Sequence, residues 1–388
     1  MSARGSLGPR VKLRSVCSIV AGQSPSSSAY NGDGNGLPFY QGKKEFTDRY
    51  LAAPSVWTTE TTKRALSGDI VMSVRAPVGP VNEVLEDICI GRGLAAIRAG
   101  DGIERGFLWY ALLWMQPRIT GSDGAVFPSI SRAQIEELEI PLPPTNEQKL
   151  IVAALDQAFA ALDRARANIE ASISDARALY QSFLAGILEK DGQFWPAVKL
   201  GEVYDVRDGT HDSPKYQEFG HALVTSKNLT SEGLDLSKVS YISSGDFIEI
   251  SRRSAVHRGD LLFAMIGTIG NPTVVEIEPT FAIKNVALFK MRRDRDARFL
   301  RHLLSSQQVK EQMEREAKGT TQKFVGLGYL RDFEARIPPR EEERRIIELL
   351  DEVESKSRKA ADALKRNAED LTALRQSLLQ AAFSGQLS

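Results

Sequence analysis

Apolar positions recur at alternating intervals of three and four residues along two long stretches of the chain. The first stretch covers residues 143–188, and adding 195 to each number gives the second, 338–383, without a gap. Such spacing predicts a helix whose apolar seam packs against another helix. The seam positions are Ile151, Leu155, Ala158, Leu162, Ala165, Ile169, Ser172, Ala176, Leu179 and Phe183 in the first copy, and Ile346, Leu350, Val353, Ser357, Ala360, Leu364, Asn367, Leu371, Leu374 and Leu378 in the second. Both seams carry a polar residue at the same place, Ser172 and Asn367. Two matched seams favour helices that pack on each other over amphipathic helices that each cover a separate core.

Proline pairs mark the start of both predicted helices. Residues 143–144 and 338–339 are prolines, which end an extended segment and cannot lie inside a helix. Thr145 and Gln148 then form a candidate capping box. The second copy opens instead with glutamates at 341–343, whose charge suits a helix N-terminus.

The length of each predicted helix indicates that the two run antiparallel. At about 1.5 Å per residue each helix is roughly 65 Å long, whereas the domain-sized segment between them spans about 30–35 Å. A parallel pair would require that segment to carry the chain back along the whole helix. With the helices aligned end to end, small residues face large ones, as a filled seam requires. The predicted pairs are Ala158 with Leu371, Ala165 with Leu364, Ile169 with Ala360, and Ala176 with Val353.

The segments that precede the helices, residues 10–142 and 197–337, have the pattern of short strands, turns and few helices. We expect short helices at 107–115 and 131–138. Landmarks that recur in both segments are Val11-Lys12-Leu13 with Val198-Lys199-Leu200, Gly68-Asp69 with Gly259-Asp260, Gly79 with Gly270, and Phe107-Leu108 with Phe299-Leu300. The fold class is therefore predicted as α+β, a pseudo-two-fold tandem duplication. Its parts are a domain at 10–142, a helix at 143–190, a domain at 197–337 and a helix at 338–384, with each domain folding on its own core.

Composition adds few constraints to this picture. A chain of 388 residues is expected to form two or three domains, and its apolar runs are too short for a membrane span. The first ten residues lack the apolar segment of a signal peptide, and two cysteines are too few for a disulfide framework, so a cytoplasmic setting is expected. The formal net charge is zero, which disfavours a strongly basic nucleic-acid binder.

Catalytic motifs are not found in the sequence. It contains no phosphate-binding loop, no His-Glu-x-x-His, no Cys-x-x-Cys and no nucleophile elbow, and its four histidines show no metal spacing. Asp294 with Glu316 and Lys318 loosely resembles a nuclease pattern, but these residues lie in a charge-rich stretch where chance is the better explanation. We therefore expect a chain with no catalytic residues and no bound metal.

Polar loops of similar placement remain in both predicted domains. They contain the serine, tyrosine, asparagine, glutamine and lysine side chains that bind base edges and phosphates. Solvent-exposed loops often have the same composition, so the paired placement carries more weight than any single residue. The candidate DNA contacts are Ser26, Tyr30, Asn31, Gln41 and Lys43 in the first domain, and Thr210, His211, Lys215, Lys227, Asn228 and Gln322 in the second.

Together these loops and helices make the chain resemble a specificity subunit of a type I restriction–modification system. The stretches 22–31 and 37–42 resemble the opening of one kind of target-recognition domain, and 208–216 with 224–228 resembles another. Gly319-Thr320-Thr321-Gln322-Lys323-Phe324 is similar to a loop found late in such domains, whereas the first domain departs from it with Gly124-Ala125-Val126-Phe127. Both predicted helices, with their double prolines, fit the spacer regions of that family.

The resemblance implies a non-catalytic reader of double-stranded DNA. Each domain would bind one half of a split, asymmetric target, and the helices would hold the halves apart. Two modification subunits would supply S-adenosylmethionine and methylate adenine, and restriction subunits would cleave with ATP and magnesium, so no cofactor is expected on this chain. The alternatives are a coiled-coil scaffold whose end domains bind protein, and a lone metal-dependent nuclease.

Overall fold

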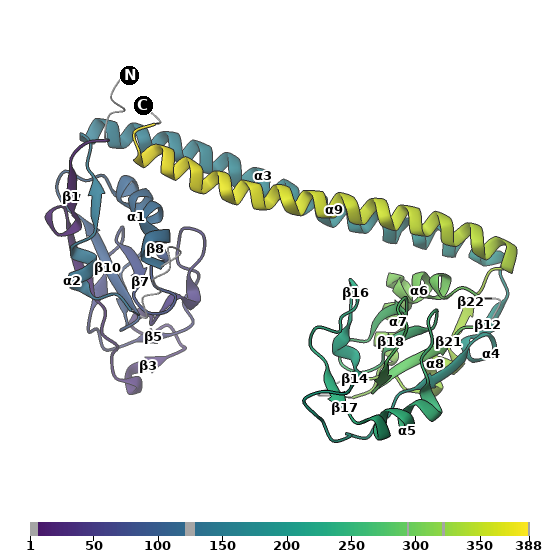
Figure 1. Cartoon of the computed structure of the whole chain (residues 1–388). Coiled ribbons are helices and arrows are strands. Elements are labelled where there is room, and N and C mark those ends of the chain that lie inside the picture. The colour runs from purple at the N-terminus through teal and green to yellow at the C-terminus, as the bar shows by residue number, and fades with distance from the viewer. Residues whose placement is uncertain (1–6, 121–128, 293–294, 320–322, 387–388) are drawn as a thin grey trace. The chain divides into compact units, whose positions relative to one another are not determined.

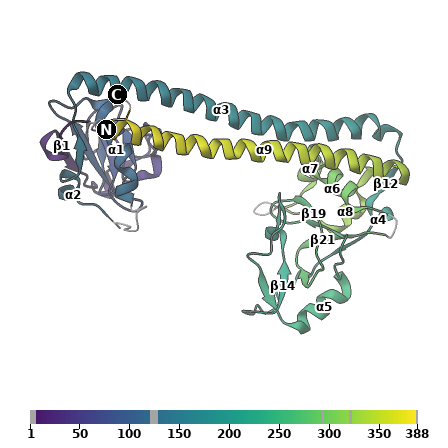
Figure 2. The same cartoon turned by 45° about the horizontal axis from the view of Figure 1, so that its top comes forward.

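Two compact units make up the computed structural model, which describes residues 7–120, 129–292, 295–319 and 323–386. The first unit contains Met1–Ile169 and Arg366–Ser388, and the second contains Glu170–Lys365. Each unit combines one globular domain with about half of each long helix, α3 (Thr145–Lys190) and α9 (Arg340–Phe383). Within each unit the two helix segments lie side by side and run in opposite directions (Figures 1 and 2). The two predicted helices and their antiparallel pairing are confirmed.

In the far half of α3 the predicted seam residue Ala176 is half-buried, but the other predicted positions are wrong by one residue. Leu179 is 62% exposed and Phe183 is 37% exposed, whereas Tyr180 and Leu184 are buried at 7% and 0%. Ser172 is exposed as well. Because an α-helix has about 3.6 residues per turn, a seam counted at 3.5 drifts off the buried face after several turns.

The same drift is found in α9. Its first seam positions are buried or half-buried as predicted, and Leu364, Leu371 and Leu378 are half-buried as well. Ala360, Asn367 and Leu374 are exposed, whereas Leu379, Ala382 and Phe383 are buried near the end. The polar residue within this seam is Ser357, whose hydroxyl donates a hydrogen bond to the carbonyl of Ala176. Ser357 lies one turn beyond Val353, the partner predicted for Ala176. Ser172 and Asn367, the polar residues predicted for the two seams, therefore both lie outside the seam.

Gln148 does not close a capping box with Thr145. Its buried amide donates to the carbonyls of Pro143 and Gly102 and accepts from the backbone N–H of Glu104 at 2.7 Å. The equivalent residue of α9, Glu343, is also buried, and it forms an ion pair with Arg295. Gln148 and Glu343 thus both connect the start of a long helix to the loop that precedes a helix of the domain, α1 (Arg105–Thr120) or α6 (Ala297–Ser305).

Two larger sheets and one two-stranded sheet form the described part of the first domain. An antiparallel sheet has the order β2 (Cys17–Ala21), β10 (Leu94–Ala99), β7 (Ile70–Ser73), β8 (Val81–Glu83). A second sheet has the order β3 (Tyr30–Asn31), β5 (Trp57–Thr58), β4 (Leu37–Tyr40), β9 (Ile88–Ile90), β6 (Arg64–Ala65), and within it β4 and β9 are parallel. The strand β1 (Arg10–Lys12) pairs with β11 (Glu139–Pro141), and the helices are α1 (Arg105–Thr120) and α2 (Arg132–Glu136), with single 3₁₀ turns at Leu13–Ser15, Ser27–Ala29 and Lys43–Glu45. The two predicted short helices are confirmed, and Ser131 caps the second of them.

The second domain repeats this plan. Its antiparallel sheet has the order β13 (Asp205–Asp208), β21 (Val286–Lys290), β18 (Leu261–Ala264), β19 (Gly270–Val274). The parallel pair is β14 (His221–Val224) with β20 (Phe281–Ile283), and β17 (Ser240–Ile242) joins β14. The other elements are β12 (Ala197–Lys199), β15 (Leu229–Thr230), β16 (Gly233–Leu234), β22 (Glu334–Arg336), α4 (Leu200–Val203), α5 (Ser244–Ser254), α6 (Ala297–Ser305), α7 (Gln307–Glu316) and α8 (Leu327–Asp332), with 3₁₀ turns at Gly192–Phe194 and Ser226–Asn228. The two domains therefore share the strand order of the antiparallel sheet and a parallel strand pair, and the second adds α5.

The glycine–aspartate landmark has the same structure in both domains. Gly68 and Gly259 have φ angles of 88° and 90°, a left-handed conformation that glycine adopts without strain. The carboxylates of the buried Asp69 and Asp260 each accept a hydrogen bond at 2.8 Å from a backbone N–H three residues earlier. The predicted equivalence of these turns is confirmed.

The core of each domain extends onto the long helices. In the first unit Phe383 of α9 packs against Phe107 and Trp114 of α1, and Phe159 of α3 packs against Tyr110. In the second unit α6 shares one apolar core with residues of both helices: Tyr180, Leu184, Ile346 and Leu350. The expectation that each domain folds on a core of its own holds for one smaller cluster in each domain, whereas helix residues complete the larger core of each unit.

An aspartate that recurs in the two long helices forms a hydrogen bond with one helix of each domain, α1 or α6. The hydroxyl of Tyr110 donates to Asp156 at 2.7 Å, and Nε2 of His302 lies 2.8 Å from a carboxylate oxygen of Asp351. Asp156 and Asp351 occupy the same position of the 195-residue repeat. The repeated Leu-Asp pair thus joins helix to domain in both units.

Candidate nucleic-acid interface

Three strand ends meet at one place in the first domain. Gly22, which follows β2, donates its N–H to the carbonyl of Leu94 at 2.9 Å, and Gln23 donates to Ile90 at 2.9 Å. Gly91, which follows β9, donates to Tyr40 at the end of β4 at 2.8 Å. A Cβ atom on Gly22 would lie 2.2 Å from the carbonyl oxygen of Gly91, so only glycine allows this approach. We call this place the strand junction.

The second domain has the same strand junction. Gly209 donates to Val286 at 3.0 Å, Thr210 donates to Ile283 at 3.0 Å, and Lys284 donates to Val224 at 2.8 Å. A Cβ atom on Gly209 would lie 2.2 Å from the carbonyl oxygen of Ile283. The loops that the sequence singled out therefore start from equivalent backbone positions in the two domains.

Cationic side chains surround the strand junction of the first domain. A hollow of about 220 Å³ lies there, lined by Gln41, Gly42, Lys43, Ser73, Arg75, Ala76, Arg92 and Gly93. Lys43, Arg75 and Arg92 are exposed, and within the described residues none of the three forms an ion pair. The structure thus brings the predicted Gln41 and Lys43 together with two arginines that the sequence prediction missed. A signal for Arg92 exists in the sequence, since it lies between two glycines directly after a strand.

The other predicted residues of the first domain contact their own loop. The ring of Tyr30 stacks on Phe39 with centroids 4.8 Å apart, and its hydroxyl donates to Pro25. The amide of Asn31 accepts from the backbone of Asp33 and Asn35 and donates to the carbonyl of Asn35. The hydroxyl of Ser26 lies 2.8 Å from that of Ser28. Ser26 is exposed, whereas Tyr30 and Asn31 are half-buried and shape the loop.

The six candidates of the second domain fall into different settings. Lys215 and Lys227 are exposed, and Lys227 lies in a 3₁₀ turn after β14, as Lys43 does after β4. Asn228 is 5% exposed, and its amide is saturated by Thr225, Asp235 and Lys238. Gln322 lies outside the described residues, as does the 124–127 stretch of the first domain. These hydrogen bonds indicate that Asn228 stabilises the loop around it.

Thr210 and His211 lie directly in the strand junction. Nε2 of His211 is 2.8 Å from a carboxylate oxygen of Asp208, and Nδ1 is 2.8 Å from the amide oxygen of Asn285. Asp208 also forms an ion pair with Arg253. The hydrogen bonds to Asn285 and Asp208 raise the pKa of His211 above its usual 6.5. The imidazole is therefore held, with its charged form favoured, against the side chain of Asn285.

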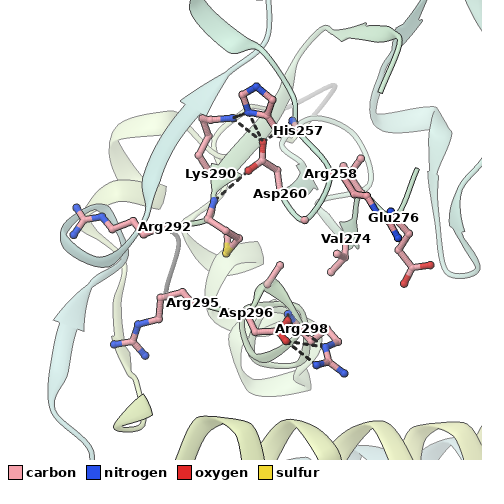
Figure 3. A pocket seen from close by; sticks show the side chains of 14 residues that line it. His257, Arg258, Asp260, Val274, Glu276, Lys290, Arg292, Arg295, Asp296 and Arg298 are labelled. Atoms are coloured by element: carbon pink, nitrogen blue, oxygen red, sulfur yellow. Dashed lines mark hydrogen bonds and ion pairs between the residues drawn. The ribbon is translucent and has the colours of Figure 1, made fainter. Parts of the chain in front are cut away.

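A larger hollow of about 760 Å³ opens at the edge of the sheet in the second domain (Figure 3). Lys290 donates to Asp260 at 2.7 Å and lies 2.8 Å from Nδ1 of His257, while Arg298 pairs with Asp296 at 2.7 Å. The lining residues are His257, Arg258, Gly259, Asp260, Val274, Val275, Glu276, Lys290, Met291, Arg292, Arg295, Asp296, Ala297 and Arg298. These ion pairs engage the acidic side chains Asp260 and Asp296 of the lining.

One group in the described part of the chain has metal-ligand spacing. Ligand atoms of His302, Asp351 and Glu354 lie within 4.8 Å of one another. Arg301 contacts both carboxylates, at 3.3 Å and 2.5 Å, and Arg298 lies 2.8 Å from Asp351. Burial lowers the pKa of His302. Because arginines already neutralise the carboxylates, this group is an ion-pair network between α6 and α9.

Comparison with known proteins identifies the class. A family model described as "Type I restriction modification DNA specificity domain" matches residues 10–173 and 193–365. The chain belongs to this family of type I restriction–modification specificity subunits.

Several specificity subunits are similar to the chain. It is 45% identical over 139 residues to a putative type I restriction enzyme MjaX specificity subunit of Methanocaldococcus jannaschii, a match that covers 35% of this chain and 32% of that protein. It is 23% identical over 271 residues to the MjaVIII specificity subunit of the same organism, covering 64% and 63%. It is 21% identical over 430 residues to the EcoBI specificity subunit of Escherichia coli, covering 98% and 86%. The matched region thus covers about a third of the MjaX subunit and just under two thirds of the MjaVIII subunit.

Solved structures share the fold. A chain from a study of "complex assembly and conformational transition of the type I R-M system" matches with a TM-score of 0.75 and 21% identity, covering 97% of this chain and 98% of that one. The HsdS subunit from Thermoanaerobacter tengcongensis matches with a TM-score of 0.52 and 21% identity, covering 97% of each. In the described residues, no helix is long and apolar enough to cross a membrane.

Proposed function

We propose that this chain is the DNA-reading subunit of a type I restriction–modification complex, and that each domain binds one half of an asymmetric bipartite target. The observation that carries the proposal is the strand junction, which recurs with the same backbone hydrogen bonds and different side chains. Gly22 and Gly209 start the two loops in the same way, but Lys43 and Arg92 surround one junction and His211 and Asn285 the other. A shared scaffold with diverged side chains suits two half-sites of different sequence.

The charges at the two junctions support binding to nucleic acid. Lysines position a protein on DNA through phosphates, whereas arginine and asparagine side chains distinguish bases in the major groove. Lys43, Lys215 and Lys227 are exposed, and within the described residues none of them is ion-paired. Because the formal net charge of the chain is zero, partner subunits supply much of the phosphate contact in this proposal.

The long helices act as a spacer in the proposed complex. Both are continuous, and each contributes to the core of both units. Because the spacer helices form part of both cores, the separation of the half-sites depends on the fold of the domains. The number of unspecified base pairs between the half-sites would therefore be fixed.

Methylation and cleavage belong to partner subunits in this proposal. Two modification subunits bind S-adenosylmethionine and methylate adenine, and restriction subunits cleave DNA with ATP and magnesium. The specificity subunit itself is not an enzyme, binds none of these cofactors and works in the cytoplasm, where its double-stranded DNA lies.

A binding selection tests this function. The chain, assembled with its modification subunits, is incubated with duplexes of random sequence, and the bound fraction is sequenced and titrated at several salt concentrations. We expect one motif of two unlike half-sites at a fixed spacing, with affinity that falls steeply as salt rises because counterions are released. Binding without sequence preference, or affinity that does not change with salt, would contradict the proposal and favour a protein-binding scaffold.

A further inference from the structure

We infer that Arg92 and Asn285 are the specificity-determining residues of the two domains. Arg92 reads a guanine in the half-site of the first domain, and Asn285 reads an adenine in the half-site of the second. This inference rests on the proposed function and adds the base that each strand junction recognises.

The two residues occupy the same position of the duplicated scaffold. Each is the second residue after the parallel strand of its domain, β9 or β20. The residue before each donates its N–H to the end of the neighbouring parallel strand at 2.8 Å. The N–H groups of both also bond to the loop after the glycine, Arg92 to the hydroxyl of Ser24 at 3.3 Å and Asn285 to the carbonyl of Thr210 at 3.1 Å. Both side chains therefore start from the same place after the parallel strand, with a left-handed backbone at Asn285 only.

Arg92 has the setting that guanine recognition requires. Its side chain is exposed at the hollow that Lys43 and Arg75 also line, and it has no acidic partner among the described residues. The backbone beneath it is tightly held, since a Cβ atom on Gly93 would lie 2.3 Å from the carbonyl oxygen of Gln41. An arginine fork donates two parallel hydrogen bonds to O6 and N7 of guanine. Lys43 and Arg75 suit the flanking phosphates.

Asn285 has its amide oriented in advance. Its backbone is left-handed, with a φ of 54°, and its amide oxygen lies 2.8 Å from Nδ1 of His211. Nε2 of His211 lies 2.8 Å from Asp208, which in turn pairs with Arg253. An amide oxygen accepts two hydrogen bonds, so one remains available while the NH₂ group turns away from the imidazole. A paired amide donor and acceptor matches N7 and N6 of adenine.

Substitutions that preserve charge or backbone test both assignments on the selected target. Arg92→Lys keeps the charge and loses the fork, and Asn285→Gly keeps the left-handed backbone and loses the amide. Relative binding of all single-base variants of the target is measured for each. We expect Arg92→Lys to lower the preference for one guanine roughly 5- to 150-fold. Asn285→Gly should lower the preference for one adenine, in the other half-site, by about the same factor.

Matched controls separate base reading from charge and folding. Lys44→Ala removes a neighbouring exposed charge that does not line the hollow, and Asn271→Gly alters the other left-handed asparagine, which bonds to Leu229. Both should leave every base preference unchanged. If Arg92→Lys and Asn285→Gly bind with the wild-type preference profile, the inference is wrong although the proposed function stands. If the wild-type complex selects no motif, the proposed function itself fails.

Discussion

Leu379 and Leu374 provide a direct test of how the long helices pack. They are the same residue type on the same helix segment, but Leu379 is 1% exposed and Leu374 is 46% exposed. Leu379 belongs to the core that contains Leu155, Phe159 and Phe383. Replacing a buried leucine by alanine lowers the free energy of unfolding by about 2–5 kcal/mol. Replacing a half-exposed leucine lowers it by a fraction of this amount, because the side chain buries less apolar surface in the folded state.

Calorimetry measures the thermal unfolding of the two variants. At roughly 2–4 °C per kcal/mol for a unit of this size, Leu379→Ala should lower the melting temperature of its unit by about 4–20 °C. Leu374→Ala should lower it by no more than a few degrees. The spacing of three and four residues counted from the sequence makes Leu374 the seam residue and predicts the opposite order. A larger effect of Leu374→Ala would refute the packing described above.

Three further predictions concern DNA and pH. Inserting one heptad into both long helices should lengthen the spacer of the selected target by roughly 10 Å, about three base pairs, or abolish binding through the accompanying rotation; an unchanged, tightly bound target would contradict the spacer role. The pKa of His211 is raised by its hydrogen bonds with Asn285 and Asp208, so the stabilisation from these contacts is complete below pH 6.5 and is lost as pH rises through the raised pKa. A histidine titration followed by NMR checks this, and a pKa at or below 6.5 would exclude it. Replacing the domain at 197–337, together with the helix residues of its core, by the first domain and its own helix residues should give a protein that selects an inverted repeat; selection of the original asymmetric motif would contradict modular reading.

Much of the fold could be predicted from the sequence because the duplication supplies an internal comparison. The repeated prolines set the helix starts, and the repeated Gly-Asp pair predicted equivalent turns at Gly68 and Gly259. The seam failed past the helix middle because a period of about 3.5 and one of about 3.6 differ by a whole residue only after several turns. Gln148 was misassigned because a local capping pattern does not reveal the loop that the amide reaches.

The candidate site was predicted less well than the fold. Gln41, Lys43, Thr210 and His211 do lie at the strand junctions, since they follow strand ends that the sequence marks with glycine and polar residues. Whether a polar side chain is available depends on tertiary contacts that no local pattern shows. Asn228 illustrates this, because it is buried and saturated by residues up to ten positions away. The arginines at 75 and 92 come from strand ends that are distant in sequence from the loops.

The most direct test of the proposed function is methylome sequencing of cells that carry this chain with its modification subunit. The account predicts adenine methylation at one asymmetric motif with two half-sites, present only when the chain is expressed. Arg92→Lys should relax this motif in one half-site only. Cells without the chain that show the same motif, or cells with it that show none, would contradict its role as the specificity subunit.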